Sequence, residues 1–170
     1  MEMKSIEQDT RAFLIAEAFQ FIDRIVGTPG VKRIAMLGSL LSSKVDPKDI
    51  DILITIDDEV DLTALAKSAR RLKGIAQSKN KGADLFLANS AGQYIGRICH
   101  WSRCGPRFRV TCDARNCGSR EYLHDDLDDI NLDPLLVKEP PLEIWPTVVY
   151  RQSVASDLLP FLKRFEMHIE

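Results

Sequence analysis

Alternation of apolar and polar positions is clearest in Asp49–Ile56, where isoleucines occupy every second position. A period of two is typical of a strand with one buried face, so this segment is predicted to be a β-strand. Apolar runs at Val31–Leu37 and Ala83–Ala88 predict two further strands. Together these segments predict an α+β fold, built on a short mixed sheet with helices packed on one side.

A period of three to four residues predicts a first helix over residues 1 to about 30. Its start has the spacing of a capping box, and its expected buried positions are Phe13, Ala16, Phe19, Ile22 and Val26. The capping box is formed by Ser5 and Gln8. A second helix is expected to be capped by Asp61 and to end near Lys73, because Gly74 follows.

A last helix is predicted from about Ser153 to His168, with Pro160 bending it or starting a second segment. Prolines at positions 134, 140, 141 and 146 predict extended backbone before it. The chain is therefore divided into a core (1–92), a cysteine-rich module (93–133) and a proline-rich connection with a terminal helix (134–170).

The composition is that of a globular protein: 170 residues, 45% hydrophobic, 28% charged, with a formal net charge of −2. These values exclude collagen-like, coiled-coil and wholly disordered chains. No apolar run approaches the ~18 residues that span a bilayer. The first ten residues lack the apolar stretch of a signal peptide. We therefore expect a cytoplasmic protein with no membrane partner.

Candidate chemistry enters with Asp49 and Asp51, whose side chains lie on the same side of the predicted strand. A D-x-D pair is often a solvent-facing or edge pair, but two adjacent carboxylates also suit Mg²⁺ or Mn²⁺. Upstream, Gly38 and Ser39 follow a buried strand. Backbone N–H groups at such a junction can bind a phosphate, and glycine permits its close approach.

The segment IAMLGSLLSSKVDPKDIDILITI resembles the signature of the DNA polymerase β-type nucleotidyltransferase superfamily, in its small stand-alone form. That family includes the minimal nucleotidyltransferases of toxin–antitoxin pairs and the aminoglycoside nucleotidyltransferases. The resemblance covers about residues 30 to 90. It implies a nucleotidyltransferase fold in which Asp49, Asp51 and a third carboxylate, matched by Asp84, bind Mg²⁺ or Mn²⁺ and are catalytic.

The resemblance further implies transfer of a nucleoside monophosphate from an NTP, with ATP favoured, to a hydroxyl of RNA, a protein or a small molecule. The implied phosphate-binding residues are Gly38, Ser39, Ser42, Ser43 and Lys44. The residues after Ser39 lack the second glycine that many small members carry. That departure favours an alternative: a catalytically inactive interaction protein, either an antitoxin-like partner of a toxin-like chain or a zinc-bearing nucleic-acid adaptor.

All four cysteines fall in one 19-residue window, at Cys99, Cys104, Cys112 and Cys117. Two C-x₄-C pairs in a cytosolic chain suggest a structural Zn²⁺ site in a zinc-ribbon-like module, with His100 as a substitute for Cys99. Free thiols and disulfides are the alternatives. His124 beside four aspartates suggests either a metal ligand or a solvated acidic segment.

Six arginines in residues 97–120 would bind a nucleic-acid backbone or pair with the acidic residues that follow. The arginines are Arg97, Arg103, Arg107, Arg109, Arg115 and Arg120, and the acidic residues are Asp125, Asp126, Asp128 and Asp129.

Overall fold

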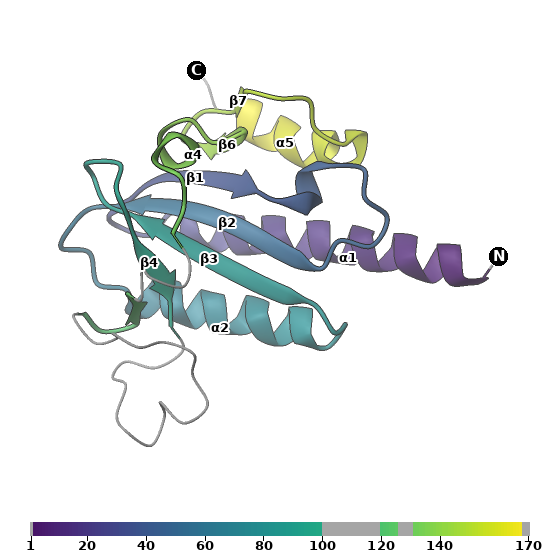
Figure 1. Cartoon of the computed structure of the whole chain (residues 1–170), viewed down its shortest axis with the longest axis horizontal. Helices are drawn as coiled ribbons and strands as arrows, with labels where there is room; N and C mark the ends of the chain where they lie inside the picture. Colours follow the sequence, from purple (N-terminus) through teal and green to yellow (C-terminus); the bar gives the residue numbers. More distant parts are fainter. Residues whose placement is uncertain (1, 100–119, 126–130, 168–170) are drawn as a thin grey trace.

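A computed structural model describes residues 2–99, 120–125 and 131–167 (Figure 1). In chain order the elements are α1 Glu2–Ile25, β1 Val31–Leu37, the 3₁₀ helix η1 Ser39–Leu41, β2 Asp49–Ile56, α2 Thr63–Gln77, β3 Gly82–Ala88, β4 Tyr94–Ile98, β5 Leu123–His124, α4 Pro134–Lys138, β6 Leu142–Trp145, β7 Val149–Tyr150, the 3₁₀ helix η2 Ser156–Leu158 and α5 Leu159–Glu166. No helix among these residues is long and apolar enough to span a membrane.

The strands form one mixed sheet in the order β5-β4-β3-β2-β1-β6-β7. Only the β2–β3 pair is parallel within this sheet; every other neighbouring pair is antiparallel. A parallel pair needs a crossover, and α2 supplies it. As a consequence β2 and β3 both begin at the same edge of the sheet, which places residues early in each strand side by side.

One face of the sheet carries the main core. The four isoleucines of β2 at even positions all point into it, as their alternation predicts. Helices α1 and α2 lie side by side on this face (Figure 1). The C-terminal α5 completes the core next to β6, and Phe161 stacks on Phe19 of α1 at a centroid distance of 5.0 Å.

The opposite face has a smaller apolar cluster, which includes Leu37, Leu53 and Phe86 from the three central strands. Val137 of α4 is 1% exposed and packs against this cluster. The expectation that helices cover one side only is therefore wrong: α1, α2 and α5 cover one face, and the short α4 covers part of the other. The apolar residues at alternate positions of β1, β2 and β3 require that cover.

The α+β class with a mixed sheet is confirmed, and the predicted bounds of β1 and β2 are those observed. The sheet is wider than the three strands predicted, because β4 and β5 extend it at one edge and β6 and β7 at the other. Residues from all three predicted divisions thus share one sheet. The division itself, the specific nucleotidyltransferase fold and the cysteine module stay predictions.

Several predicted helix limits are wrong. Helix α1 begins at Glu2, so Ser5 lies inside the helix and not at its cap, and α1 ends at Ile25. The predicted buried face lies along one edge of the stripe that is fully buried in the structure. The residues of that stripe are Leu14, Ile15, Ala18, Phe19, Phe21, Ile22 and Ile25.

Helix α2 continues through Gly74 to Gln77. Its start is as predicted in one respect, since the Asp61 carboxylate accepts a hydrogen bond from the Thr63 N–H at 2.9 Å. Pro134 begins α4 instead of lying in extended backbone, and Pro160 lies in the first turn of α5 after η2.

Candidate functional site

Three carboxylates lie on the face of the sheet opposite α1 and α2, where β2 and β3 begin. Asp51 is the direct register partner of Asp84, and Asp49 is the partner of Gly82. Side chains at alternate positions share a face, and Leu53 and Phe86, two residues further along these strands, both join the smaller apolar cluster. Because neighbouring strands are about 4.8 Å apart, this register brings two acidic side chains next to each other.

The electrostatic consequence is largest at Asp51. Burial, followed by the negative charges of Asp84 and Asp49, raises the pKa of Asp51 to about 6. Both causes make the ionised form of this carboxylate less stable than it is in water. A bound cation would reverse the second cause and offset the first.

Two glycines provide the space that these carboxylates occupy. A Cβ atom built on Gly38 would overlap the Asp51 Oδ2 atom, and one built on Gly82 would overlap the Asp49 Oδ1 atom. Gly38 also has φ +77° and ψ −163°, a backbone conformation that is essentially restricted to glycine. The predicted role of Gly38 in phosphate approach is untested, but its contact with Asp51 gives a second reason for a glycine here.

Asp84 has a basic neighbour that the sequence analysis assigned elsewhere. Arg97 Nη1 of β4 lies 3.6 Å from Asp84 Oδ1. This ion pair follows from the antiparallel pairing of β3 with β4, two strands joined by a short turn. A strand prediction at Tyr94–Ile98 would have identified the partner. Arg97 therefore offsets part of the acidic charge at the site.

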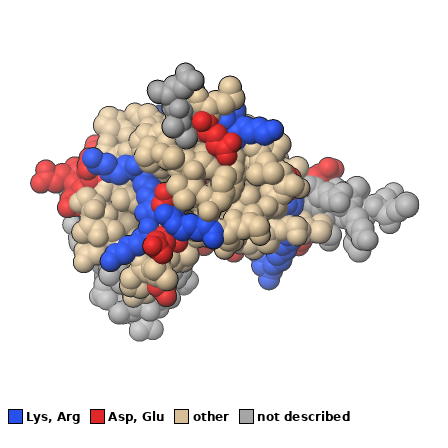
Figure 2. Space-filling view, turned by 90° about the horizontal axis from the view of Figure 1, so that it is seen from above, with Lys and Arg blue, Asp and Glu red and all other residues tan. Residues whose placement is uncertain are grey.

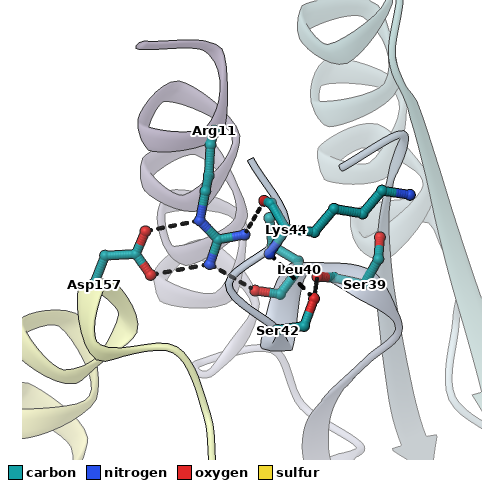
Figure 3. Close-up of polar contacts among 6 residues, drawn as sticks. All are labelled: Arg11, Ser39, Leu40, Ser42, Lys44 and Asp157. Carbon is teal, nitrogen blue, oxygen red and sulfur yellow. Dashed lines mark hydrogen bonds and ion pairs between the residues drawn. The ribbon is translucent and has the colours of Figure 1, made fainter. Parts of the chain in front are cut away.

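The predicted phosphate-binding residues lie in η1 and the loop after it, next to the carboxylates. Ser42 Oγ donates to the Ser39 carbonyl at 2.8 Å and accepts from the Lys44 N–H at 3.3 Å, so its hydroxyl holds the loop together. Ser43 and Lys44 are exposed and Ser39 is partly exposed. The side chains of Ser39 and Lys44 point to the same side of this loop (Figure 3).

Arg11 of α1 supports the loop from the opposite side, and the sequence analysis missed it (Figure 3). Its guanidinium donates to the carbonyls of Leu40 and Lys44 and to the carboxylate of Asp157. A signal was present in the sequence, because Arg11 is three and four residues before the buried Leu14 and Ile15 and thus lies on the buried stripe of the helix.

The three carboxylates suit a divalent metal in the type of their donor atoms, but not in how they are arranged. Asp49, Asp51 and Asp84 supply the oxygen ligands that Mg²⁺ and Mn²⁺ prefer. Among residues 2–99, 120–125 and 131–167, no three His, Cys, Asp or Glu side chains are arranged as a ready metal-binding group. The carboxylates thus share a face and a charge environment without surrounding one point.

The zinc prediction falls largely outside the described residues. Cys99 is buried and not in a disulfide. His100, Cys104, Cys112 and Cys117 lie in the segment that is not described, as do Arg103, Arg107, Arg109 and Arg115, together with Asp126, Asp128 and Asp129. Zinc binding stays a prediction, as does binding of nucleic acid by this segment.

Arg120 donates to the carbonyls of Asp58, at 2.9 Å, and of Val60. On the face seen in Figure 2, basic side chains gather in one band with acidic side chains beside them. That face therefore presents both signs of charge side by side.

A cleft of about 870 Å³ lies at the opposite end of β2, between residues 28–30, 57–61 and the start of α2. None of the predicted site residues lines it, and Asp57, Asp58, Glu59 and Asp61 make its rim acidic. We assign the candidate chemistry to the carboxylate face, where the predicted site residues lie, and not to this cleft.

Comparison of the chain with protein-family models, curated proteins and solved structures gave no match. The reading of the site therefore depends on the residues and contacts described above.

Proposed function

We propose that this protein is a Mg²⁺-dependent nucleotidyltransferase that moves a nucleoside monophosphate from an NTP, ATP first among candidates, to an acceptor hydroxyl. The observation that carries the proposal is the register of β2 with β3, which makes Asp51 the neighbour of Asp84 with Asp49 two residues away. Gly38, the glycine of the segment that resembles the nucleotidyltransferase signature, packs against the Asp51 carboxylate. Residues 38, 49, 51 and 84 thus lie close together although they are distant along the chain.

The three carboxylates would hold the divalent ion. When bound, that ion would neutralise charge on the triphosphate and on the leaving pyrophosphate. A raised pKa at Asp51 supports this assignment, since a carboxylate that is destabilised by like charges gains most from a cation.

The chain's own residues would bind and orient the substrates. Ser39 and Lys44 point to the same side of the loop and would contact the terminal phosphates (Figure 3). The acceptor oxygen forms a bond to the α-phosphorus as the bond from that phosphorus to the bridging oxygen of pyrophosphate breaks. The hydroxyl proton passes to a carboxylate oxygen of Asp84, and pyrophosphate leaves with the cleaved electron pair.

A second candidate is favoured by one contact. The ion pair between Arg97 and Asp84 satisfies the third carboxylate without a metal. In this alternative the chain keeps the fold and acts as an interaction protein, with a protein or nucleic-acid partner. The two candidates differ in whether nucleotide binding requires a divalent ion.

The discriminating experiment is thermal unfolding of the full chain with each of the four NTPs, with and without Mg²⁺ or Mn²⁺. A ligand at 100 times its Kd adds about 2.7 kcal/mol to the free energy of unfolding. For a chain of this size that corresponds to a rise in Tm of roughly 5–11 °C. The variant Asp49→Ala/Asp51→Ala should lose the metal-dependent rise.

The matched control is Asp57→Ala/Glu59→Ala, which removes the same charge with the same spacing at the other end of β2. It should keep the rise. If wild type gives no rise with any nucleotide, the enzyme proposal is wrong. Where binding is found, transfer is tested with α-labelled NTP and release of pyrophosphate.

A further inference from the structure

Arg11 is the only charged or polar residue among the buried side chains of the described chain, with 6% of its surface exposed. All three guanidinium nitrogens donate hydrogen bonds (Figure 3). Nε and Nη2 donate to the two carboxylate oxygens of Asp157, at 2.8 and 2.9 Å. Nη1 donates to the Lys44 carbonyl at 3.0 Å, and Nη2 also donates to the Leu40 carbonyl at 3.1 Å.

These contacts join three distant parts of the chain. Arg11 belongs to α1, Leu40 and Lys44 bracket the loop after β1, and Asp157 lies in η2, 146 residues after Arg11. The same loop has a second link to the C-terminal region, because the Ala155 N–H donates to the Leu41 carbonyl at 2.8 Å. Folding of the C-terminal segment is thereby coupled to the backbone of the loop.

Burying an arginine is costly unless its charge and its N–H groups are satisfied, and an apolar side chain would fill this position of α1 at lower cost. What an apolar residue would not supply is a planar group that fixes two carbonyls and a carboxylate at once. The arginine therefore determines the loop's geometry more than it adds to the core.

The geometry also leaves the other side of the loop for a ligand. Arg11 binds the backbone carbonyls of Lys44 and of Leu40, the residue after Ser39. The side chains of Ser39 and Lys44 point away from Arg11 (Figure 3). At its start the loop follows Gly38, whose contact with Asp51 joins it to the carboxylates. A shift of the loop would thus alter the distance between the phosphate-binding side chains and the acidic site.

We propose that Arg11 and Asp157 form a clamp that positions the Ser39–Lys44 loop for the phosphate groups of the nucleotide. Arg11 is a positioning residue in this role, and Asp157 makes the C-terminal segment part of the same device. The inference rests on the proposed function, since it assigns the loop to the nucleotide.

The test uses the full chain and the variants Arg11→Gln and Asp157→Asn. Arg164→Gln is the matched control, because Arg164 of α5 also pairs with an acidic residue of α1, Asp23, at 3.2 Å, but on the surface and away from the loop. Asp157→Asn keeps the arginine in place, so it serves if Arg11→Gln fails to fold. Hydrogen exchange of residues 39–45 is measured together with the Kd of Mg²⁺–ATP, and KM and kcat where turnover is found.

We expect exchange of the loop amides to rise about tenfold or more in both variants, with β2 unchanged and the control like wild type. The Kd and KM for the nucleotide should rise by about tenfold, equivalent to about 1.4 kcal/mol, with kcat nearly unchanged. A purely structural role would lower Tm without this selective change in KM and in loop exchange.

Folded variants whose loop exchange equals that of wild type would overturn the clamp. So would faster loop exchange with unchanged nucleotide affinity. Both results presuppose a wild type that binds Mg²⁺–ATP and leave the proposed function intact. A wild type that binds no nucleotide overturns the proposed function, and the role of the clamp in phosphate binding with it.

Discussion

Replacing Asp51 by asparagine should make the metal-free protein more stable near neutral pH. The pKa of this carboxyl rises from an ordinary 3.8 to about 6, through burial and the charges of Asp84 and Asp49. A shift of this size corresponds to about 3 kcal/mol. Because Asp51 is still partly exposed, solvent screening reduces the expected gain to about 1–2 kcal/mol.

The direction of this change in stability follows from how the protonation of Asp51 depends on pH. Between pH 3.8 and about 6 the folded protein holds a proton on Asp51 that the unfolded chain has released, so wild-type stability falls as pH rises through this window and is level above it. Asp51→Asn lacks this dependence. The variant should therefore match wild type near pH 4 and exceed it by the full amount above pH 6.

The assay is urea unfolding of both proteins from pH 4 to 8, without divalent ions and then with Mg²⁺. Asp46→Asn is the control, because Asp46 is exposed and a hydrogen bond from Lys81 lowers its pKa, so its loss should not stabilise the protein. Mg²⁺ should stabilise wild type and leave Asp51→Asn unaffected. An Asp51→Asn protein that is less stable than wild type at pH 7.5, or equally stable at every pH, would refute the reasoning.

Three further substitutions test the packing of Gly38, the helical position of Gly74 and the ion pair of Asp157. Gly38→Ala forces an alanine to φ +77° against the Asp51 carboxylate, so urea unfolding should show a loss of about 1–3 kcal/mol together with loss of the Mg²⁺ effect. Gly74→Ala, inside α2 with no atom within 4 Å of the added Cβ, should instead stabilise the protein by about 0.5–1 kcal/mol in the same assay. The hydrogen bond from Arg11 lowers the pKa of Asp157, so wild-type stability should be lost as pH falls below about 4, and Asp157→Asn should flatten that part of an acid-unfolding curve.

The strands that the sequence predicts correctly are the three central ones, in which most positions are buried. β2 is the clearest case, since Ile50, Ile52, Ile54 and Ile56 are all fully buried. Its partners are mainly apolar: β1 lies between Gly30 and Gly38, and β3 begins with Gly82. Local sequence suffices for such elements because their hydrophobic pattern and their position in the sheet agree.

Short elements at the edges were not predictable in the same way. β6 has four residues and β7 has two. The place of β6 in the sheet is set by pairing with β1, more than a hundred residues earlier, and β7 pairs in turn with β6. The short α4 likewise owes its position to an apolar cluster built by other strands. Prolines near these segments suggest extended chain, but packing against distant residues decides the outcome.

For the candidate site, the acidic pair and the glycine were identifiable from spacing, and Asp84 only through the resemblance. The register of β2 with β3 then supplies what spacing could not, namely that Asp84 is the neighbour of Asp51 and not merely a later acid. Arg97 and Arg11 were missed for different reasons. The strand that carries Arg97 was not predicted, and the place of Arg11 on the buried stripe of α1 does not reveal its partner Asp157, 146 residues later.

The arrangement around Asp51 is difficult to account for as a purely structural feature. A carboxylate that is partly buried beside two others lowers stability at neutral pH, and an asparagine or threonine would fit the same strand position without that cost. Gly38, packed against it, adds a backbone conformation that other residues rarely adopt. Arg97 offsets charge at Asp84 but leaves the pKa of Asp51 raised. Strain and unfavourable charge concentrated where β2 and β3 begin are expected where binding of a cation, rather than folding alone, determines which residues are present.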